Sequence, residues 1–132
     1  MITESNITIY NKYLDKITRL DKWKKTQILN VHWEETKGIN IIKSGMSNAD
    51  SVKVFIPYLS IEDLVYIDPI QFNGKGFTIK PGDYIVKGLI EDEITSSSEL
   101  EKQYKTAVKI KTVNNRNDSL IKDLWHFEVG CE

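Results

Sequence analysis

The side chains that could support metal or nucleophile chemistry in this 132-residue chain are His32, His126 and Cys131. A zinc site needs about four convergent ligands, and the sequence has no CxxC, HxH or HExxH spacing. Each histidine falls on the polar side of a predicted strand, so we expect both to be solvated or hydrogen-bonded. Cys131 is penultimate, where chains are often poorly ordered, and a nucleophile needs a positioned base. These residues predict neither a metal site nor a catalytic cysteine.

Acidic runs and a glycine-rich loop are the other candidates for chemistry. The runs Glu34-Glu35, Glu62-Asp63 and Glu91-Asp92-Glu93 are typical of solvated surfaces and protected strand edges. Asn73-Gly74-Lys75-Gly76 lacks the lysine–hydroxyl pair of a phosphate-binding loop, and no clear helix follows it. We therefore expect no enzyme activity and no cofactor.

A basic, aromatic segment raises the question of nucleic-acid binding. Trp23 is flanked by Lys22, Lys24 and Lys25, and small β-barrels use such mixtures to stack bases and follow a phosphate backbone. The chain as a whole carries 18 basic and 19 acidic residues, a net charge of −1. A strand edge protected by lysines, with Trp23 half-buried, is therefore favoured over a nucleic-acid site.

Composition predicts one globular domain over residues 1–132. Hydrophobic residues make up 40% and charged residues 28%, the values of an ordinary folded protein. A single cysteine forms no internal disulfide, and the N-terminus lacks a signal-peptide pattern. No apolar run reaches the roughly 18–20 residues that span a bilayer. We expect assembly in a cytosol and no membrane partner.

The N-terminal half predicts strands. Residues 7–13 alternate β-forming side chains, as a strand or as an extended arm over residues 1–14. Residues 23–34 alternate as well. The side chains of this second segment that we expect to face the core are Leu29, Val31 and Trp33.

The middle of the chain combines one strand with a long loop. Residues 51–56 alternate into a strand that Pro57 ends, because proline lacks the ladder donor. The long loop over residues 58–76 follows, with a helical turn expected near Ile61 to Leu64. Long loops within compact domains are commonly functional or mobile.

The C-terminal half carries the clearest local signals. Residues 77–80 predict a strand, Lys80-Pro81-Gly82-Asp83 a turn, and residues 84–90 another strand with a bulge at Gly88. Ser96 with Glu99, or Ser98 with Glu101, forms a capping box.

The last third predicts a helix and two strands. The helix spans about residues 97–105, and residues 107–113 alternate with Val108 and Ile110 on one face. Residues 114–118 predict a hairpin loop. Residues 124–129 predict the final strand, and its inward side chains are Trp125, Phe127 and Val129. The fold class is mainly β: a small single-domain β-barrel or sandwich with one short helix and extended loops.

Apolar and aromatic residues exceed what one barrel core needs. Aromatic residues are enriched at protein interfaces, so the surplus indicates self-assembly as readily as packing over the barrel ends. The candidate assembly residues are Ile9, Tyr10, Tyr13, Ile41, Ile42, Tyr58, Leu59, Tyr66 and Ile67.

Five segments together carry a resemblance to a known family. They are Ile9-Tyr10-Asn11-Lys12-Tyr13, Val31-His32-Trp33, Ser51-Val52-Lys53-Val54-Phe55-Ile56-Pro57, Lys80-Pro81-Gly82-Asp83-Tyr84-Ile85-Val86-Lys87-Gly88 and Trp125-His126-Phe127-Glu128-Val129-Gly130. Over nearly its whole length the chain resembles uncharacterised proteins of tailed phages and prophages of low-GC Gram-positive bacteria. It is similar, more weakly, to phage head-closure and minor capsid proteins.

The resemblance implies a virion protein of the head–tail connector, of head-closure type. Such a protein would form a ring of identical subunits between the portal or adaptor and the tail, and would be assembled in the host cytoplasm. DNA would be present only as non-specific channel contents. A tail-terminator or minor capsid protein is the alternative within the virion. A small phage inhibitor or regulator that binds a host protein or nucleic acid is the alternative outside it.

Overall fold

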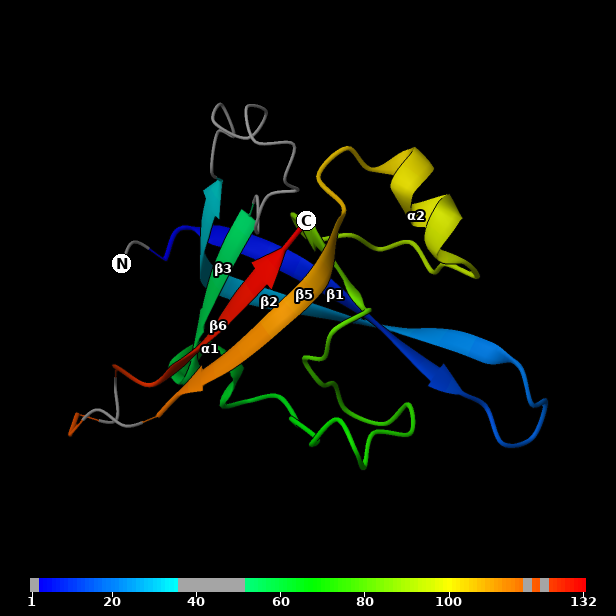
Figure 1. Ribbon diagram of the computed structural model, residues 1–132, viewed down its shortest axis with the longest axis horizontal. Coiled ribbons are helices and arrows are strands. Elements are labelled where there is room, and N and C mark those ends of the chain that lie inside the picture. Colours follow the sequence, from blue (N-terminus) through cyan, green and yellow to red (C-terminus); the bar gives the residue numbers. More distant parts are fainter. Residues whose placement is uncertain (1–2, 36–51, 118–119, 122–123) are drawn as a thin grey trace, which may run out of the picture.

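The computed structural model describes residues 3–35, 52–117, 120–121 and 124–132 (Figure 1). Its strands are β1 (Ser5–Leu14), β2 (Asp21–Glu35), β3 (Val52–Pro57), β4 (Tyr84–Lys87), β5 (Val108–Arg116) and β6 (His126–Cys131). Its helices are α1 (Tyr58–Ile61) and α2 (Ser97–Gln103). The prediction of a mainly β fold is confirmed, and the first segment is a strand of the sheet rather than a free arm.

The six strands form a closed antiparallel barrel. Their order is β1-β2-β3-β6-β5-β4, and β4 pairs with β1 to close the cylinder. In Figure 1, β3, β6 and β5 form a layer that crosses β1 and β2. The structure therefore decides between the two predicted architectures in favour of the barrel, and it adds a one-turn helix, α1, to the expected α2.

Aliphatic side chains from every strand fill the barrel. Those with no exposed surface include Ile7, Ile9, Ile28, Val31, Val54, Ile56, Ile85, Ile110 and Val129. Their alternation with outward residues is what a closed sheet requires, since successive side chains point to opposite faces. The terminal strand belongs to this core. Cys131 is fully buried in β6, so the expectation of a poorly ordered end is wrong.

Strand β1 is buried on both faces. Ile9 points into the barrel, whereas Tyr10 points outward and packs in a second apolar cluster with Leu100 of α2. Both side chains are at most 1% exposed. The prediction that Ile9 and Tyr10 form an assembly surface is therefore wrong, because both stabilise the fold of a single chain.

A bulge in β2 reverses the predicted inward face of that strand. Ser5 pairs with Val31 but Ile7 pairs with Ile28, so β2 carries one extra residue at this point. Asn30 takes a positive φ of 59° to accommodate it. Val31 faces the core as predicted, but its neighbour inside is Ile28. Leu29 is instead 50% exposed, which corrects the inward prediction for that residue.

The turn prediction at Lys80-Pro81-Gly82-Asp83 is confirmed. Gly82 has a φ of 94°, and the Asp83 N–H donates to the Lys80 carbonyl oxygen over 3.3 Å, as in a type II turn. Residues 77–80 do not form the expected strand, and only a single bridge joins Tyr66 to Phe77. Strand β4 ends at Lys87, where Gly88 takes a φ of 107°.

Three boundaries differ from the sequence prediction. Helix α1 begins directly after Pro57, earlier than expected, and the turn expected near residues 61–64 follows it, with the Leu64 N–H donating to the Ile61 carbonyl oxygen over 3.0 Å. Strand β5 continues through Arg116 by pairing with β6, so the start of the predicted loop over residues 114–118 is a strand. Trp125 lies just before β6 and outside the barrel, so its predicted inward position is wrong. Phe127 and Val129 are inward as predicted.

Candidate functional site

An apolar hollow lies where α1 meets the start of β6. Strand β3 ends at Pro57, and the backbone N–H of Tyr58 donates to the Trp125 carbonyl oxygen over 3.0 Å. This bond attaches α1 to the segment that enters β6. The polypeptide therefore brings residues about seventy positions apart into one wall of the hollow.

Aromatic rings make up most of that wall. The Tyr58 ring lies 5.7 Å from Trp125, edge to face, and 5.4 Å from Phe127, nearly parallel. The Tyr66 ring lies 5.1 Å from Phe127. These separations are those of favourable aromatic pairs, which fix the rings in place.

We refer to this hollow as the aromatic groove. It has a volume of about 630 Å³. Its lining residues are Tyr58, Leu59, Ile61, Glu62, Leu64, Tyr66, Asn115, Trp125 and Phe127. Burial raises the pKa of Tyr66, and the Tyr58 hydroxyl donates to Asn115 Oδ1. Because apolar and aromatic side chains make up most of its lining, with one carboxylate at its edge, the groove suits binding of apolar side chains.

Backbone hydrogen bonds hold the part of the long loop that lines the groove. The Ile67 N–H donates to the Phe77 carbonyl oxygen (2.8 Å), and the Phe77 N–H donates to the Val65 carbonyl oxygen (2.9 Å). Gly76 lies so close to this pair of segments that a Cβ atom there would be 2.5 Å from the Val65 carbonyl oxygen. The loop is thus packed against the barrel, and Gly76 is required for that close approach.

A buried polar cluster fastens the same loop to β1. Asn11 Nδ2 donates to the Thr78 carbonyl oxygen and to Asp83 Oδ2, each over 2.8 Å, and Asn11 Oδ1 accepts from the Thr78 N–H. Asp83, 1% exposed, also forms an ion pair with Lys80 at 2.7 Å. Buried carboxylates of this kind are tolerated only when so bonded, which gives the cluster a structural role.

The hairpin that joins β1 to β2 is the second candidate surface. The Asp15 N–H donates to the Leu20 carbonyl oxygen, the Arg19 N–H donates to the Asp15 carbonyl oxygen, and Arg19 has a φ of 60°. Ion pairs brace the strands beside it, Lys22 to Asp15 at 2.8 Å and Lys12 to Asp21 at 3.3 Å. The hydrogen bond from Lys22 lowers the pKa of Asp15.

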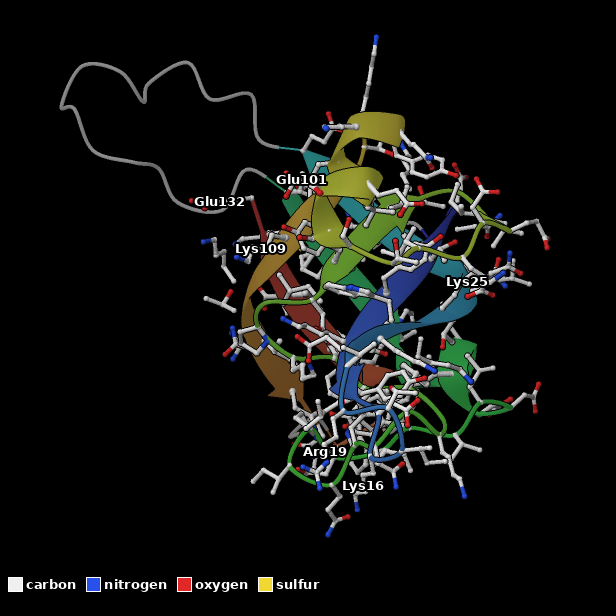
Figure 2. All side chains as sticks on the ribbon, turned by 90° about the vertical axis from the view of Figure 1, so that its right-hand side faces the viewer. Lys16, Arg19, Lys25, Glu101, Lys109 and Glu132 are labelled. Carbon is white, nitrogen blue, oxygen red and sulfur yellow. The ribbon has the colours of Figure 1, made fainter. Side chains whose placement is uncertain are left out.

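We refer to residues 14–20 as the hairpin tip. Its aliphatic side chains are strongly exposed: Leu14 is 58%, Ile17 92% and Leu20 64% accessible. Figure 2 shows Lys16 and Arg19 extending from the same end of the molecule. In Figure 1 the tip lies at the far right of the long axis, whereas α1 and the start of β6 lie toward the left. Such a group of exposed aliphatic residues is typical of an interaction surface.

The structure brings three of the nine predicted assembly residues together: Tyr58, Leu59 and Tyr66 all line the aromatic groove. Tyr13 is half-buried against Phe72, with ring centroids 6.2 Å apart, and Ile67 is half-buried in the loop. Ile41 and Ile42 lie outside the described residues.

Sequence reasoning missed the hairpin tip and the contribution of Trp125. Residues 15–21 appear polar, yet Ile17 and Leu20 stand within that polar turn. An aliphatic residue at the apex of a predicted turn was the available signal, because turns normally carry Gly, Pro, Asn, Asp or Ser. For Trp125 no local pattern separates a groove position from a core position.

The structure keeps the two histidines and the cysteine of the sequence in separate surroundings. His32 stacks on Phe55 with ring centroids 5.3 Å apart, His126 Nδ1 lies 2.9 Å from the Leu124 carbonyl oxygen, and Cys131 is in the core. Among the described residues, no group of three or more His, Cys, Asp or Glu side chains could hold a metal ion. Within the same residues, no helix is long and apolar enough to cross a membrane.

Comparison with known proteins places the chain in a family. Neither the curated proteins nor the solved structures contain a significant match to it. The pattern of one protein family covers residues 2–132, which is nearly the whole chain. The chain therefore belongs to the Family of unknown function (DUF6751).

Proposed function

We propose that this protein is a structural subunit of a phage virion, acting at the head–tail connector in the manner of a head-closure protein. Copies of the barrel would form a ring between the portal or adaptor and the tail. The role is mechanical: the barrel supplies a rigid body, and exposed surfaces bind neighbouring subunits. The protein is not an enzyme in this proposal, and it binds no cofactor.

The observation that carries the proposal is the pair of apolar surfaces at opposite ends of a rigid barrel. The hairpin tip exposes Leu14, Ile17 and Leu20, and the aromatic groove lies at the other end (Figure 1). A subunit in a ring needs two different surfaces, since cyclic assemblies beyond the dimer use heterologous contacts. The chain offers two such surfaces, and the sequence resemblance to phage structural proteins supports the virion setting.

The charge of the chain suits a channel through which DNA passes. Basic and acidic residues nearly balance, with a net charge of −1. Tight binding of the phosphate backbone comes from many lysine and arginine contacts, each of which releases counterions. A nearly neutral ring would let DNA move through without holding it.

Quantitative mass spectrometry of purified phage particles tests this function. The expected result is a copy number for this protein similar to that of the portal, with a tail-tube protein as the reference for a higher copy number. Absence from particles, together with abundance in infected cells, would overturn the proposal and favour an inhibitor of a host protein. A copy number far above that of the portal would overturn the connector position in favour of a minor capsid protein.

A further inference from the structure

We infer that the hairpin tip of one copy of this chain inserts into the aromatic groove of the next copy. The inference rests on the ring assembly of the proposed function and names the two surfaces that would make the contact. The occupant of the groove is therefore a second copy of this chain.

Position is the first argument for a contact between copies. The tip and the groove lie at opposite ends of the long axis of the molecule (Figure 1). A tip therefore meets the groove of another copy and not its own. Contacts between two different patches of the same chain are heterologous, and they close into a ring when the rotation between subunits divides a full turn.

Complementary chemistry is the second argument. Ile17, 92% exposed, projects at the apex between Leu14 and Leu20. The groove presents aromatic faces of Tyr58 and Trp125 within a hollow of about 630 Å³. Branched aliphatic side chains that pack against aromatic rings remove apolar area from water on both partners, which is the main favourable term in association.

Charge is the third argument. The tip carries Lys16 and Arg19, and the groove is bordered by Glu62 with Asp63 beside it. All four side chains are exposed, and none of them forms an ion pair within the part of the chain that the structure describes. Cations on the tip and the two carboxylates at one edge of the groove favour the tip-to-groove orientation over tip-to-tip or groove-to-groove pairing.

Rigidity is the fourth argument. Backbone hydrogen bonds close the tip between Asp15 and Leu20, side-chain oxygens of Asp15 and Thr18 accept from the Ile17 and Leu20 N–H groups, and the Lys22–Asp15 ion pair braces it. A projection already held in one shape loses less conformational entropy on insertion than a flexible loop would.

Cysteine crosslinking of mixed variants tests the contact. Ile17→Cys and Leu59→Cys each place one thiol at an exposed position, and the native Cys131 is buried in the core. A short bismaleimide should give covalent dimers when the two variants are mixed, and little dimer with either variant alone. Wild-type protein measures any background from Cys131. Lys105→Cys mixed with Leu59→Cys is the matched control, since Lys105 is exposed near α2 and should not crosslink.

A charge exchange tests the same contact without cysteines. The double variant Lys16→Glu/Arg19→Glu should weaken self-association by about ten-fold or more, measured by sedimentation velocity. Combining it with Glu62→Lys/Asp63→Lys should restore association. Lys102→Glu/Lys105→Glu on the α2 side makes the same charge change and should have no such effect. All these positions are exposed, so circular dichroism should show an unchanged fold.

The outcomes separate the contact from the virion role. Crosslinking of Ile17→Cys alone would overturn the inference, because it indicates symmetric tip-to-tip pairing. No crosslinking in the mixture, with the protein present in particles at the copy number of the portal, would overturn the contact and leave the connector role. Crosslinking in the mixture, with the protein missing from particles, would support the contact and overturn the virion role alone.

Discussion

Two apolar surfaces on the outside of the barrel have similar chemistry, but one is buried within the chain and the other is open. On one side, Tyr10 and Tyr84 are covered by Ile94 and by Leu100 of α2, and all four are at most 6% exposed. We refer to these four residues as the covered side. At the end of the barrel near α1, the aromatic groove stays open, and no described segment covers it. The chain uses a capped helix to bury the first surface, which stabilises the monomer. The second remains available to a partner, at a cost in monomer solubility that an assembly would remove.

The largest expected loss of stability comes from removing a buried side chain of the covered side. Leu100→Ala removes a side chain with no exposed surface, so we expect a loss of about 2–5 kcal/mol in the free energy of unfolding, from lost burial and a residual cavity. Leu59→Ala at the edge of the groove is the matched control. Leu59 is 54% exposed, so this change should alter the stability of the monomer by no more than about 0.5 kcal/mol. Urea denaturation measures both, and equal losses would contradict the distinction between the two surfaces.

The second largest loss of stability is expected from the buried polar cluster around Asn11, next to the loop that lines the groove. Asn11→Ala leaves Asp83 Oδ2 and the Thr78 backbone without their buried partner, so we expect a loss of about 1–3 kcal/mol. The loop below the groove should also loosen, which hydrogen exchange at Phe77 would detect. Gln71→Ala, at an exposed position in the same loop, is the control and should be nearly neutral. Equal protection of Phe77 in the variant and the wild type would show that the polar cluster does not fasten the loop.

Alkaline pH should weaken the covered side. Burial raises the pKa of Tyr10 and of Tyr84, and the hydrogen bond to Asp92 raises the pKa of Tyr104. The folded state therefore keeps protons that the unfolded chain releases above about pH 10. The contribution of these protons to the free energy of unfolding should be fully present below that pH. It should fall as the pH rises, by about 1.4 kcal/mol per pH unit for Tyr10.

Tyr10→Phe gives the control for this pH dependence. The Tyr10 hydroxyl donates to the Asp92 carbonyl oxygen over 2.7 Å, so the variant loses that bond at every pH. It should nevertheless lose less stability than the wild type between pH 10 and pH 12, because one titrating group is gone. Unfolding curves at several pH values measure the two slopes. Identical slopes would contradict a proton held on Tyr10.

The strands and the core could be predicted from the sequence because their signals are local. Alternation of apolar and polar residues located β1, β3 and β6, and Pro81-Gly82 located a turn whose glycine takes a positive φ. The inward face of β2 could not be predicted, because the bulge at Asn30 depends on pairing with β1. A strand that changes face midway violates the simple period of two.

The candidate surfaces were less predictable than the fold. Tyr58, Leu59 and Tyr66 were expected to contact partners, and they do share the groove. Their neighbours Trp125 and Phe127 arrive from the other end of the chain, so only the barrel topology brings them there. Ile9 and Tyr10 have the same composition as an interface, but whether a strand is covered on its outer face is decided by the placement of α2.

The smallest expected effect concerns the cap that holds α2 over Tyr10. Ser96 Oγ accepts from the Glu99 N–H over 3.3 Å, which confirms Ser96 as the N-cap of the first predicted capping box. The Glu99 carboxylate accepts from the Thr95 N–H and hydroxyl, one residue before the N-cap position that a capping box uses. Ser96→Ala should cost about 1 kcal/mol of stability, and Ser96→Asp should cost little because aspartate caps equally well. Because a helix of seven residues is not stable on its own, the loss should appear first as faster hydrogen exchange in α2. Faster exchange throughout the barrel instead would indicate that the covered side and the barrel unfold as one unit.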